Sequence, residues 1–361
     1  MSATTSVQLP DLLSLGREFE LRTNRHSRTV TSASEKWFMT EENGLSATEK
    51  ADLRSMKIGL WASACFPTCD PPQLRLAADF LTALVICNCR ITQAQSLREC
   101  GWADEQPAGN LPCLAGNDLF RDFIQNVASA MPSREKFNRS AEAFRVAQTQ
   151  VISHRKANTL PTLEAYADLR RDLSGIPMVF DLIEMAEGLK VPSGDAAWDG
   201  LKISAANLIA LSTDIFAYNN DQFIGNQFNI VSIVRTHRGL SVQAAIKYAF
   251  SLIDQSFQKF LSAESTLFSQ SPVPGQTTSM WTWNPLNWRQ TSEKTPAHVQ
   301  LTSDSKLYLC GLKDCIVGTL NWSYETGLYF GSKGDEIRAG VHAENKSRGW
   351  GKGPCLFDTD P

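Results

Sequence analysis

The sequence of 361 residues has no long hydrophobic run and no excess of either charge. No uninterrupted apolar stretch approaches the length of a membrane span, so we expect no membrane partner. Lysine and arginine number 35 against 38 aspartates and glutamates, and this balance predicts no nucleic-acid partner. The first residues show no basic start followed by an apolar stretch, so we expect a cytoplasmic protein.

Histidine is scarce, and the cysteines lack the pairing of a zinc site. The 5 histidines are scattered, and Cys65 and Cys69 have no matched second pair. Nine cysteines, an odd number without a secretion signal, favour reduced thiols that are mostly buried. The sequence therefore predicts neither a zinc centre nor a disulfide framework.

Strand-like alternation and internal repeats are also absent, whereas helical periodicity is frequent. Ser46 and Glu49 have the spacing of a capping box, which predicts a helix start there. Further helices are expected over residues 74–95, 119–127, 135–158, 199–224, 240–264 and 304–322, with a break at Ser174-Gly-Ile-Pro177. The pattern predicts an all-α domain over residues 46–335.

Three segments differ from this pattern. Residues 1–45 have weak periodicity and predict a mobile or draped N-terminal arm. Residues 269–298 are rich in Pro, Ser, Thr and Trp, which predicts a loop insertion, either a lid over a pocket or an excursion that covers core. Residues 336–361 are expected to form a C-terminal tail.

One polar helix face lies within residues 212–222. Thr213, Ala217 and Asp221 are spaced i, i+4, i+8, so on a helix they share a face, with Asp214 beside them. The stretch resembles the second metal-binding motif of class I terpene synthases, Asn-Asp-x-x-Ser-x-x-x-Glu, whose Asn, Ser and Glu hold Mg²⁺ against a substrate diphosphate. Mg²⁺ requires oxygen ligands, and Ala217 has none.

A second match lies upstream. Residues 163–175 resemble the family's Tyr-x-x-Leu-Arg-Arg-x-Thr-x-Gly segment, in which an arginine senses the diphosphate and a helix break signals its binding. By register these places are taken by Arg171, Ser174 and Gly175.

The family's Asp-rich first metal motif is altered. Phe66-Pro67, Leu74-Arg-Leu and Asp79 resemble the stretch that leads into it. Asn88, Cys89 and Thr92 then stand where carboxylates belong, and Arg90 lies among them. A guanidinium there would repel Mg²⁺.

The family's Trp-Ser-x-Glu-x-x-Arg-Tyr-Phe segment is matched over residues 322–330. Its Arg-Tyr pair closes over the diphosphate. Tyr329 is kept here, and the arginine is replaced by Leu328, which cannot donate hydrogen bonds to phosphate.

The resemblance implies an all-α, class I terpene synthase-like helical barrel that has lost its ionisation chemistry. We therefore expect a metal-independent cyclase that holds a preformed, oxidised terpenoid for a pericyclic closure of Diels-Alder type, with no cofactor. Two alternatives remain open: a Mg²⁺-dependent sesqui- or diterpene synthase with unusual ligands, and a non-catalytic terpenoid-binding protein. A homodimer is possible under each hypothesis.

The resemblance also suggests the site residues. The expected catalytic donors are Arg171, Thr213, Tyr218, Tyr329 and Arg90, and no metal ligand is expected. The expected substrate-binding residues are Phe66, Leu84, Asn88, Thr92, Gly175, Asp214, Ala217, Asp221 and Trp322.

Overall fold

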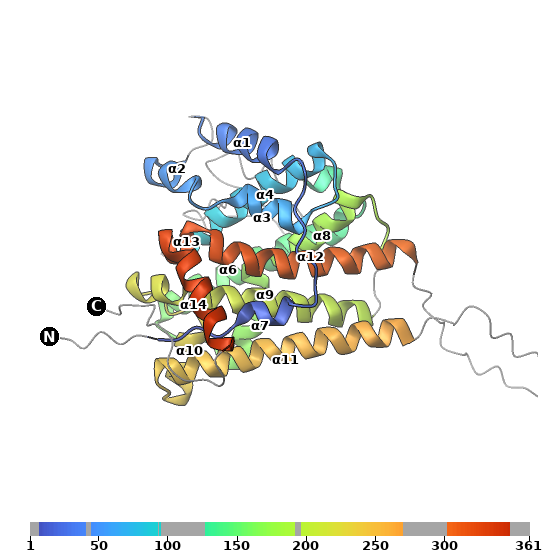
Figure 1. The fold of residues 1–361 in the computed structure, drawn as a ribbon. Coiled ribbons are helices and arrows are strands. Elements are labelled where there is room, and N and C mark those ends of the chain that lie inside the picture. Colours follow the sequence, from blue (N-terminus) through green and yellow to red (C-terminus); the bar gives the residue numbers. More distant parts are fainter. Residues whose placement is uncertain are drawn as a thin grey trace, which may run out of the picture.

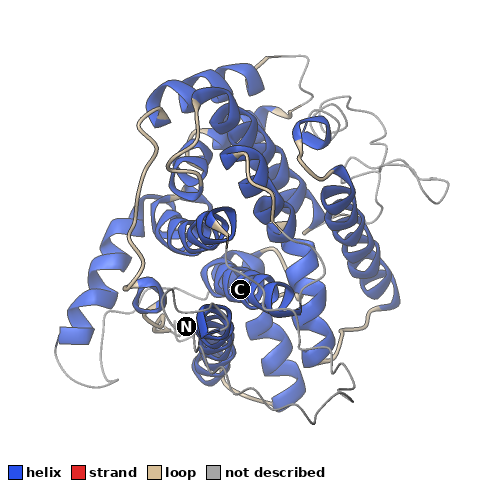
Figure 2. Ribbon diagram, turned by 90° about the vertical axis from the view of Figure 1, so that its right-hand side faces the viewer, coloured by secondary structure: helices blue, strands red, loops and turns tan. Residues whose placement is uncertain are grey.

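The computed structural model describes residues 7–40, 45–92, 94, 127–191, 196–269 and 302–346. Within these ranges the chain forms helices and no β-strand (Figures 1 and 2). The elements in the first half are η1 (Leu12–Gly16), α1 (Ser27–Phe38), α2 (Ala47–Leu53), α3 (Ile58–Cys65), α4 (Pro71–Ile91), α6 (Arg134–Ala157) and α7 (Leu163–Ser174). Those that follow are α8 (Ile176–Glu187), α9 (Ala196–Phe223), α10 (Ile230–Arg238), α11 (Val242–Ser269), α12 (Ser303–Glu325), α13 (Gly327–Phe330), η4 (Gly331–Lys333) and α14 (Gly334–Lys346).

Helix α9 forms the centre of the bundle. It packs against α7, α8, α11 and α12, and α11 and α12 run alongside it in Figure 1. Leu208, Ile209 and Phe216 of α9 are fully buried. A helix that is apolar on most faces is expected at the core of a bundle, and the all-α prediction is confirmed.

Local signals start and end the helices as the sequence predicts. The side chain of Ser46 accepts a hydrogen bond from the Glu49 N–H, and the Glu49 carboxylate accepts one from the Ser46 N–H, which completes the capping box. Gly175, at φ 72°, separates α7 from α8 in a left-handed conformation that favours glycine.

The N-terminal segment packs on the domain. Leu12 and Phe38 are fully buried, and Arg22 donates to Asp314 of α12 with an Nη2–Oδ2 distance of 2.6 Å. Asn24 donates to the carbonyl groups of Phe66 and Cys69. Residues 7–40 are therefore draped over α3, α4 and α12 and do not form a mobile arm.

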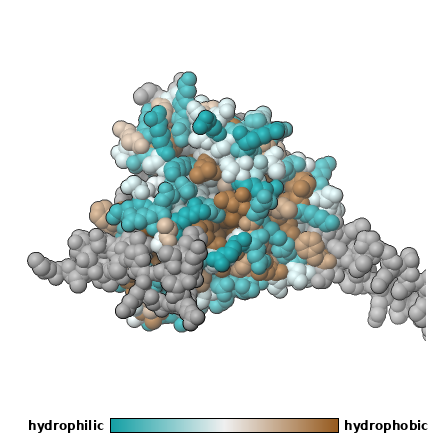
Figure 3. All heavy atoms as spheres, viewed as in Figure 1, coloured by the Kyte–Doolittle hydropathy of each residue, from teal (hydrophilic) through white to brown (hydrophobic). Residues whose placement is uncertain are grey.

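Three expected features lie outside the described residues: most of the 119–127 helix, residues 270–298 of the insertion, and the tail from residue 347. None of the described helices is long and apolar enough to cross a membrane. On the face seen in Figure 3, hydrophilic residues cover most of the described surface, with smaller apolar areas between them.

Candidate functional site

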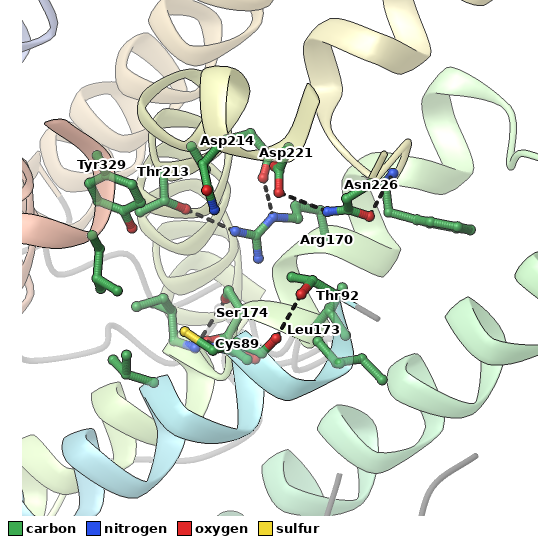
Figure 4. Close-up of a pocket in the computed structure, with 18 of the residues that line it drawn as sticks. Cys89, Thr92, Arg170, Leu173, Ser174, Thr213, Asp214, Asp221, Asn226 and Tyr329 are labelled. Carbon is green, nitrogen blue, oxygen red and sulfur yellow. Dashed lines mark hydrogen bonds and ion pairs between the residues drawn. The ribbon is translucent and has the colours of Figure 1, made fainter. Parts of the chain in front are cut away.

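A pocket lies at one end of the bundle, where the C-terminal parts of α4, α7, α9 and α12 meet α13. Apolar side chains line much of it, among them Val85, Leu173, Ile176 and Leu328. Polar side chains enter from α7 and α9 on one side and from the end of α4 on the other (Figure 4). A mostly apolar cavity with a few convergent polar groups is typical of a small-molecule site.

Two tryptophans and a tyrosine form an aromatic wall. The rings of Trp61 and Trp322 stack with centroids 4.6 Å apart, and Tyr329 packs edge-on against Trp322. Each indole N–H is bonded within the protein: Trp61 donates to Thr319 Oγ1 at 2.8 Å, and Trp322 donates to the Met56 carbonyl at 2.9 Å. Their polar edges are therefore satisfied, and the rings contribute apolar and π surface to the pocket.

The polar side of the pocket is built around Arg170 and Asp214. Arg170 donates from Nε to Asp214 Oδ1 and from Nη2 to Thr213 Oγ1, the latter at 2.9 Å. Asp214 Oδ2 accepts from the Tyr166 hydroxyl at 2.6 Å and from the Ile230 N–H at 2.8 Å. Burial alone lowers the pKa of Arg170, but the Asp214 charge raises this pKa above its ordinary value. The guanidinium therefore stays charged.

Asp221 lies further along α9 and is 6% exposed. Its two oxygens accept from the side-chain amides of Asn226 and Asn229, at 2.9 and 2.8 Å. Burial raises the pKa of the Asp221 carboxyl to about 6, and the two amide hydrogen bonds oppose this rise.

Arg155 of α6 holds the end of α4. It donates from Nη1 to the Ile91 carbonyl at 3.1 Å, from Nη2 to the Thr92 carbonyl at 3.0 Å, and from Nη1 to the Ala94 carbonyl. The last carbonyl groups of a helix have no following turn of N–H groups to donate to them, and a cation is favourable at that position. Arg155 thus fixes the helix end that carries Asn88 and Thr92.

The side chains around the pocket do not fit a magnesium site. Both oxygens of Asp214 and both of Asp221 already accept hydrogen bonds from the protein, and Ala217 has no ligand atom. Thr92 donates its hydroxyl hydrogen to the Cys89 carbonyl, and no carboxylate accompanies it on the end of α4. The described part of the chain holds no group of three or more His, Cys, Asp or Glu side chains placed to share a metal ion.

The formal charges of the described lining sum to zero. Arg155 and Arg170 contribute two positive charges, and Asp214 and Asp221 contribute two negative charges. The same lining contains no lysine. A diphosphate would therefore find no net positive field from these residues, whereas an uncharged ligand needs none.

The structure brings eight of the expected site residues to the pocket. They are Asn88, Thr92, Thr213, Asp214, Ala217, Asp221, Trp322 and Tyr329.

Three expected donors lie elsewhere. Arg171 bonds Asp168 and Asp172 on its own helix, because one residue along α7 turns the side chain away from the pocket. Arg90 forms a bidentate pair with Glu49 of α2, at 2.7 and 3.0 Å. Tyr218 accepts from Arg235 of α10 at 3.0 Å, on another face of α9. These three expected donors therefore lie outside the pocket lining.

The remaining three substrate-binding candidates belong to the core. Phe66 is 2% exposed and Leu84 is fully buried. A Cβ placed on Gly175 would lie 2.5 Å from Leu84 Cδ1, so Gly175 allows α4 to approach the turn between α7 and α8. These residues shape the scaffold behind the pocket and do not line it.

Sequence reasoning missed Arg170, Arg155 and Asn226. Arg170 stood next to the assigned Arg171 in the same Arg-Arg pair, so only the helical register distinguishes them. Arg155 gave no local signal, because the Ile91 carbonyl that it bonds lies 64 residues away in sequence. Asn226 bonds Asp221, 5 residues before it, a separation that is not a helical side-chain spacing.

Comparison with known proteins shows the family to which the chain belongs. Residues 90–259 match the model of terpene synthase family 2, C-terminal metal binding. The chain is 31% identical to sesquiterpene synthase Agr1 of Cyclocybe aegerita, over 94% of this chain and 93% of that protein. It is 29% identical to alpha-muurolene synthase of Coprinopsis cinerea, over 91% of this chain and 75% of that protein. Germacradien-4-ol synthase from Streptomyces citricolor shares the fold, with a TM-score of 0.62 at 19% identity, over 90% of this chain and 99% of that one.

Proposed function

Because this chain belongs to the terpene synthase family, we propose that it is a cyclase of terpenoid biosynthesis that closes a ring without a metal ion. Its substrate is a preformed, uncharged terpenoid that carries a diene, an alkene and at least one oxygen function. One observation carries the proposal: both oxygens of each pocket carboxylate, Asp214 and Asp221, already accept hydrogen bonds from the protein.

The residues present suit such a reaction. In an intramolecular Diels-Alder closure two carbon-carbon σ bonds form while three π bonds become one, and no atom or proton leaves the substrate. The reaction therefore needs neither a leaving-group acid nor a nucleophile. It gains from a pocket that holds the two reacting ends together, because the entropy of bringing them together is lost on binding.

Each wall of the pocket has a role in this scheme. The stacked rings of Trp61 and Trp322, with Leu173 and Ile176, offer an apolar surface against which a hydrocarbon skeleton folds. Tyr329 places its hydroxyl group on the pocket side of α13 (Figure 4). Burial raises the pKa of the Tyr329 phenol well above its ordinary value, so it remains a hydrogen-bond donor.

A second candidate is a Mg²⁺-dependent sesquiterpene synthase. The names of the relatives favour it, since sesquiterpene synthase Agr1 is similar over nearly the whole chain. Against it stands the donor set of the pocket, because the described side chains do not fit the metal ion that this reaction would require.

Product analysis with and without Mg²⁺ separates the two candidates. Farnesyl and geranylgeranyl diphosphates are incubated with the protein, and in parallel neutral oxidised terpenoids with a diene and an alkene are incubated in the presence of a chelator. We expect no hydrocarbon from the diphosphates and an isomer of unchanged mass from a neutral substrate. Hydrocarbon formed only with Mg²⁺ would establish the second candidate instead.

A further inference from the structure

Arg170 lines the pocket and has one terminal nitrogen that bonds no described residue. Its Nε and Nη2 are bonded to Asp214 and Thr213. Among the described residues its other terminal nitrogen, Nη1, has no hydrogen-bond partner. Figure 4 shows the guanidinium between the α9 side chains and the end of α4, with this nitrogen directed to the cavity.

The guanidinium is fixed in orientation. Asp214 is 2% exposed and is itself held by the Tyr166 hydroxyl and the Ile230 N–H, so the carboxylate cannot turn away from Arg170. Thr213 passes its own hydroxyl hydrogen to the Ala210 carbonyl at 2.8 Å, which leaves its oxygen as the acceptor for Nη2. A donor held in advance costs little reorganisation when it meets a ligand.

The charge of Arg170 is already compensated. Asp214 balances it, and the described lining as a whole is formally neutral. Nη1 therefore provides a directional N–H donor and no net positive electric field. Such a donor suits a neutral acceptor oxygen, and its hydrogen bond is stronger in the low-dielectric surroundings of a protein than in solution.

A carbonyl oxygen uses this donor best. Hydrogen bonding to the oxygen of an enone or enal withdraws electron density from the conjugated alkene. That alkene then reacts faster with an electron-rich diene. A hydroxyl or ether oxygen at the same place would be bound but would not be activated in this way.

We propose that Arg170 is the catalytic residue that binds and activates a conjugated carbonyl group of the substrate through Nη1. The substrate class is thereby narrowed to terpenoid aldehydes and ketones in which the carbonyl is conjugated to the reacting alkene. The N–H hydrogen stays on Arg170 throughout, and no group is transferred. The inference rests on the proposed function, because it assigns the activating group of the same ring closure.

The test uses farnesal, a conjugated fifteen-carbon aldehyde, beside the hydrocarbon farnesene. Binding of both is followed by quenching of tryptophan fluorescence, since Trp61 and Trp322 line the pocket. The carbonyl stretch of ¹³C-labelled farnesal is then measured by infrared difference spectroscopy. The variants are Arg170→Gln and, as a matched control on the same helix outside the pocket, Arg171→Gln.

We expect the wild-type protein and Arg171→Gln to bind farnesal at least about tenfold more tightly than farnesene, the usual order for a hydrogen bond to a charged donor. In both proteins the carbonyl stretch moves to lower frequency on binding. Arg170→Gln loses the preference and most of the shift. The double variant Arg170→Gln/Asp214→Asn, which removes both charges of the pair, gives the same result if the single variant is poorly folded.

Equal binding of the two ligands by wild type, no detectable farnesal binding, or an unshifted carbonyl stretch would overturn the inference. A shift that persists in Arg170→Gln would also overturn it. A separate experiment tests the proposed function. If that function is wrong, the protein forms hydrocarbon from a prenyl diphosphate only with Mg²⁺, a result that does not depend on the carbonyl frequency.

Discussion

Arg170 of α7 and Asp214 of α9 form an ion pair in which the Asp214 residue is 2% exposed, and they join the two helices at the pocket. The pair also sets the polar surface of the site, because Thr213 and Tyr166 bond to its two members. Removing one partner leaves a buried charge without compensation, which is more damaging than removing both.

The first prediction concerns this pair. Asp214→Asn is expected to lower the free energy of unfolding by about 3 to 5 kcal/mol, because Arg170 keeps its charge in a site that no longer balances it. Arg170→Gln/Asp214→Asn should cost less than the sum of the two single changes. Urea unfolding of the four proteins measures the coupling, and strictly additive effects would show that the pair is not coupled.

Gly318 provides a second prediction, at the contact of α3 with α12. A Cβ on this residue would lie 2.9 Å from the Ala64 carbonyl carbon, a backbone atom that cannot move alone. We expect Gly318→Ala to lower the free energy of unfolding by about 1 to 3 kcal/mol. Gly200→Ala is the control, since nothing lies within 4 Å of its added Cβ, and it should leave thermal stability equal or slightly higher. Equal effects of both changes would argue against close packing at Gly318.

The third prediction is a pH dependence that originates at Asp221. Burial raises its folded-state pKa to about 6, above that of the unfolded chain. Between the two pKa values the folded state binds the proton more tightly, so the free energy of unfolding falls as the pH rises through this range. Above about pH 7 the loss is complete and is on the order of 3 kcal/mol.

Asp221→Asn isolates this contribution because asparagine does not titrate. The difference in free energy of unfolding, wild type minus variant, should decrease from about pH 4 to about pH 7 and then stay level. Denaturant unfolding at a series of pH values measures it. A constant or rising difference would mean that the carboxylate is better stabilised in the folded state than its burial indicates.

The fourth prediction concerns Arg155. Arg155→Met leaves the carbonyl groups of Ile91, Thr92 and Ala94 without their shared donor. We expect this change to lower the free energy of unfolding by about 2 to 3 kcal/mol. Arg139→Met is the control on the same helix, because its pair with Glu135 is exposed and 3.7 Å long. The two variants are compared by urea unfolding. A similar cost for both would show that Arg155 does not hold the end of α4.

Much of the fold follows from local sequence signals. The capping box at Ser46 and Glu49 and the break at Ser174 and Gly175 act over a few residues, so short-range rules locate them. Helical periodicity gives the long helices, although α4 ends at Ile91 rather than near residue 95. The packing of the N-terminal segment is harder to predict from the sequence, because Leu12 and Phe38 are buried by contacts with distant helices.

The site was predicted less completely, for two physical reasons. Neighbouring residues on a helix point about 100° apart, so assigning Arg171 rather than Arg170 chose a side chain outside the pocket. Long-range pairing is the second reason: Glu49 neutralises Arg90, and Arg235 bonds Tyr218, across distances in sequence that no local pattern spans. The face of α9 with Thr213, Ala217 and Asp221 was found because its spacing is itself a local signal.

We propose above all that this pocket has exchanged magnesium and diphosphate chemistry for the binding of an uncharged terpenoid. Titration calorimetry of the purified protein with inorganic diphosphate, with and without Mg²⁺, tests this exchange without the need to know the substrate. We predict no Mg²⁺-dependent heat of diphosphate binding, because Asp214 and Asp221 are committed to protein donors and Ala217 offers no ligand. Tight binding of diphosphate that appears only with Mg²⁺ would show instead that the pocket retains the metal-dependent chemistry.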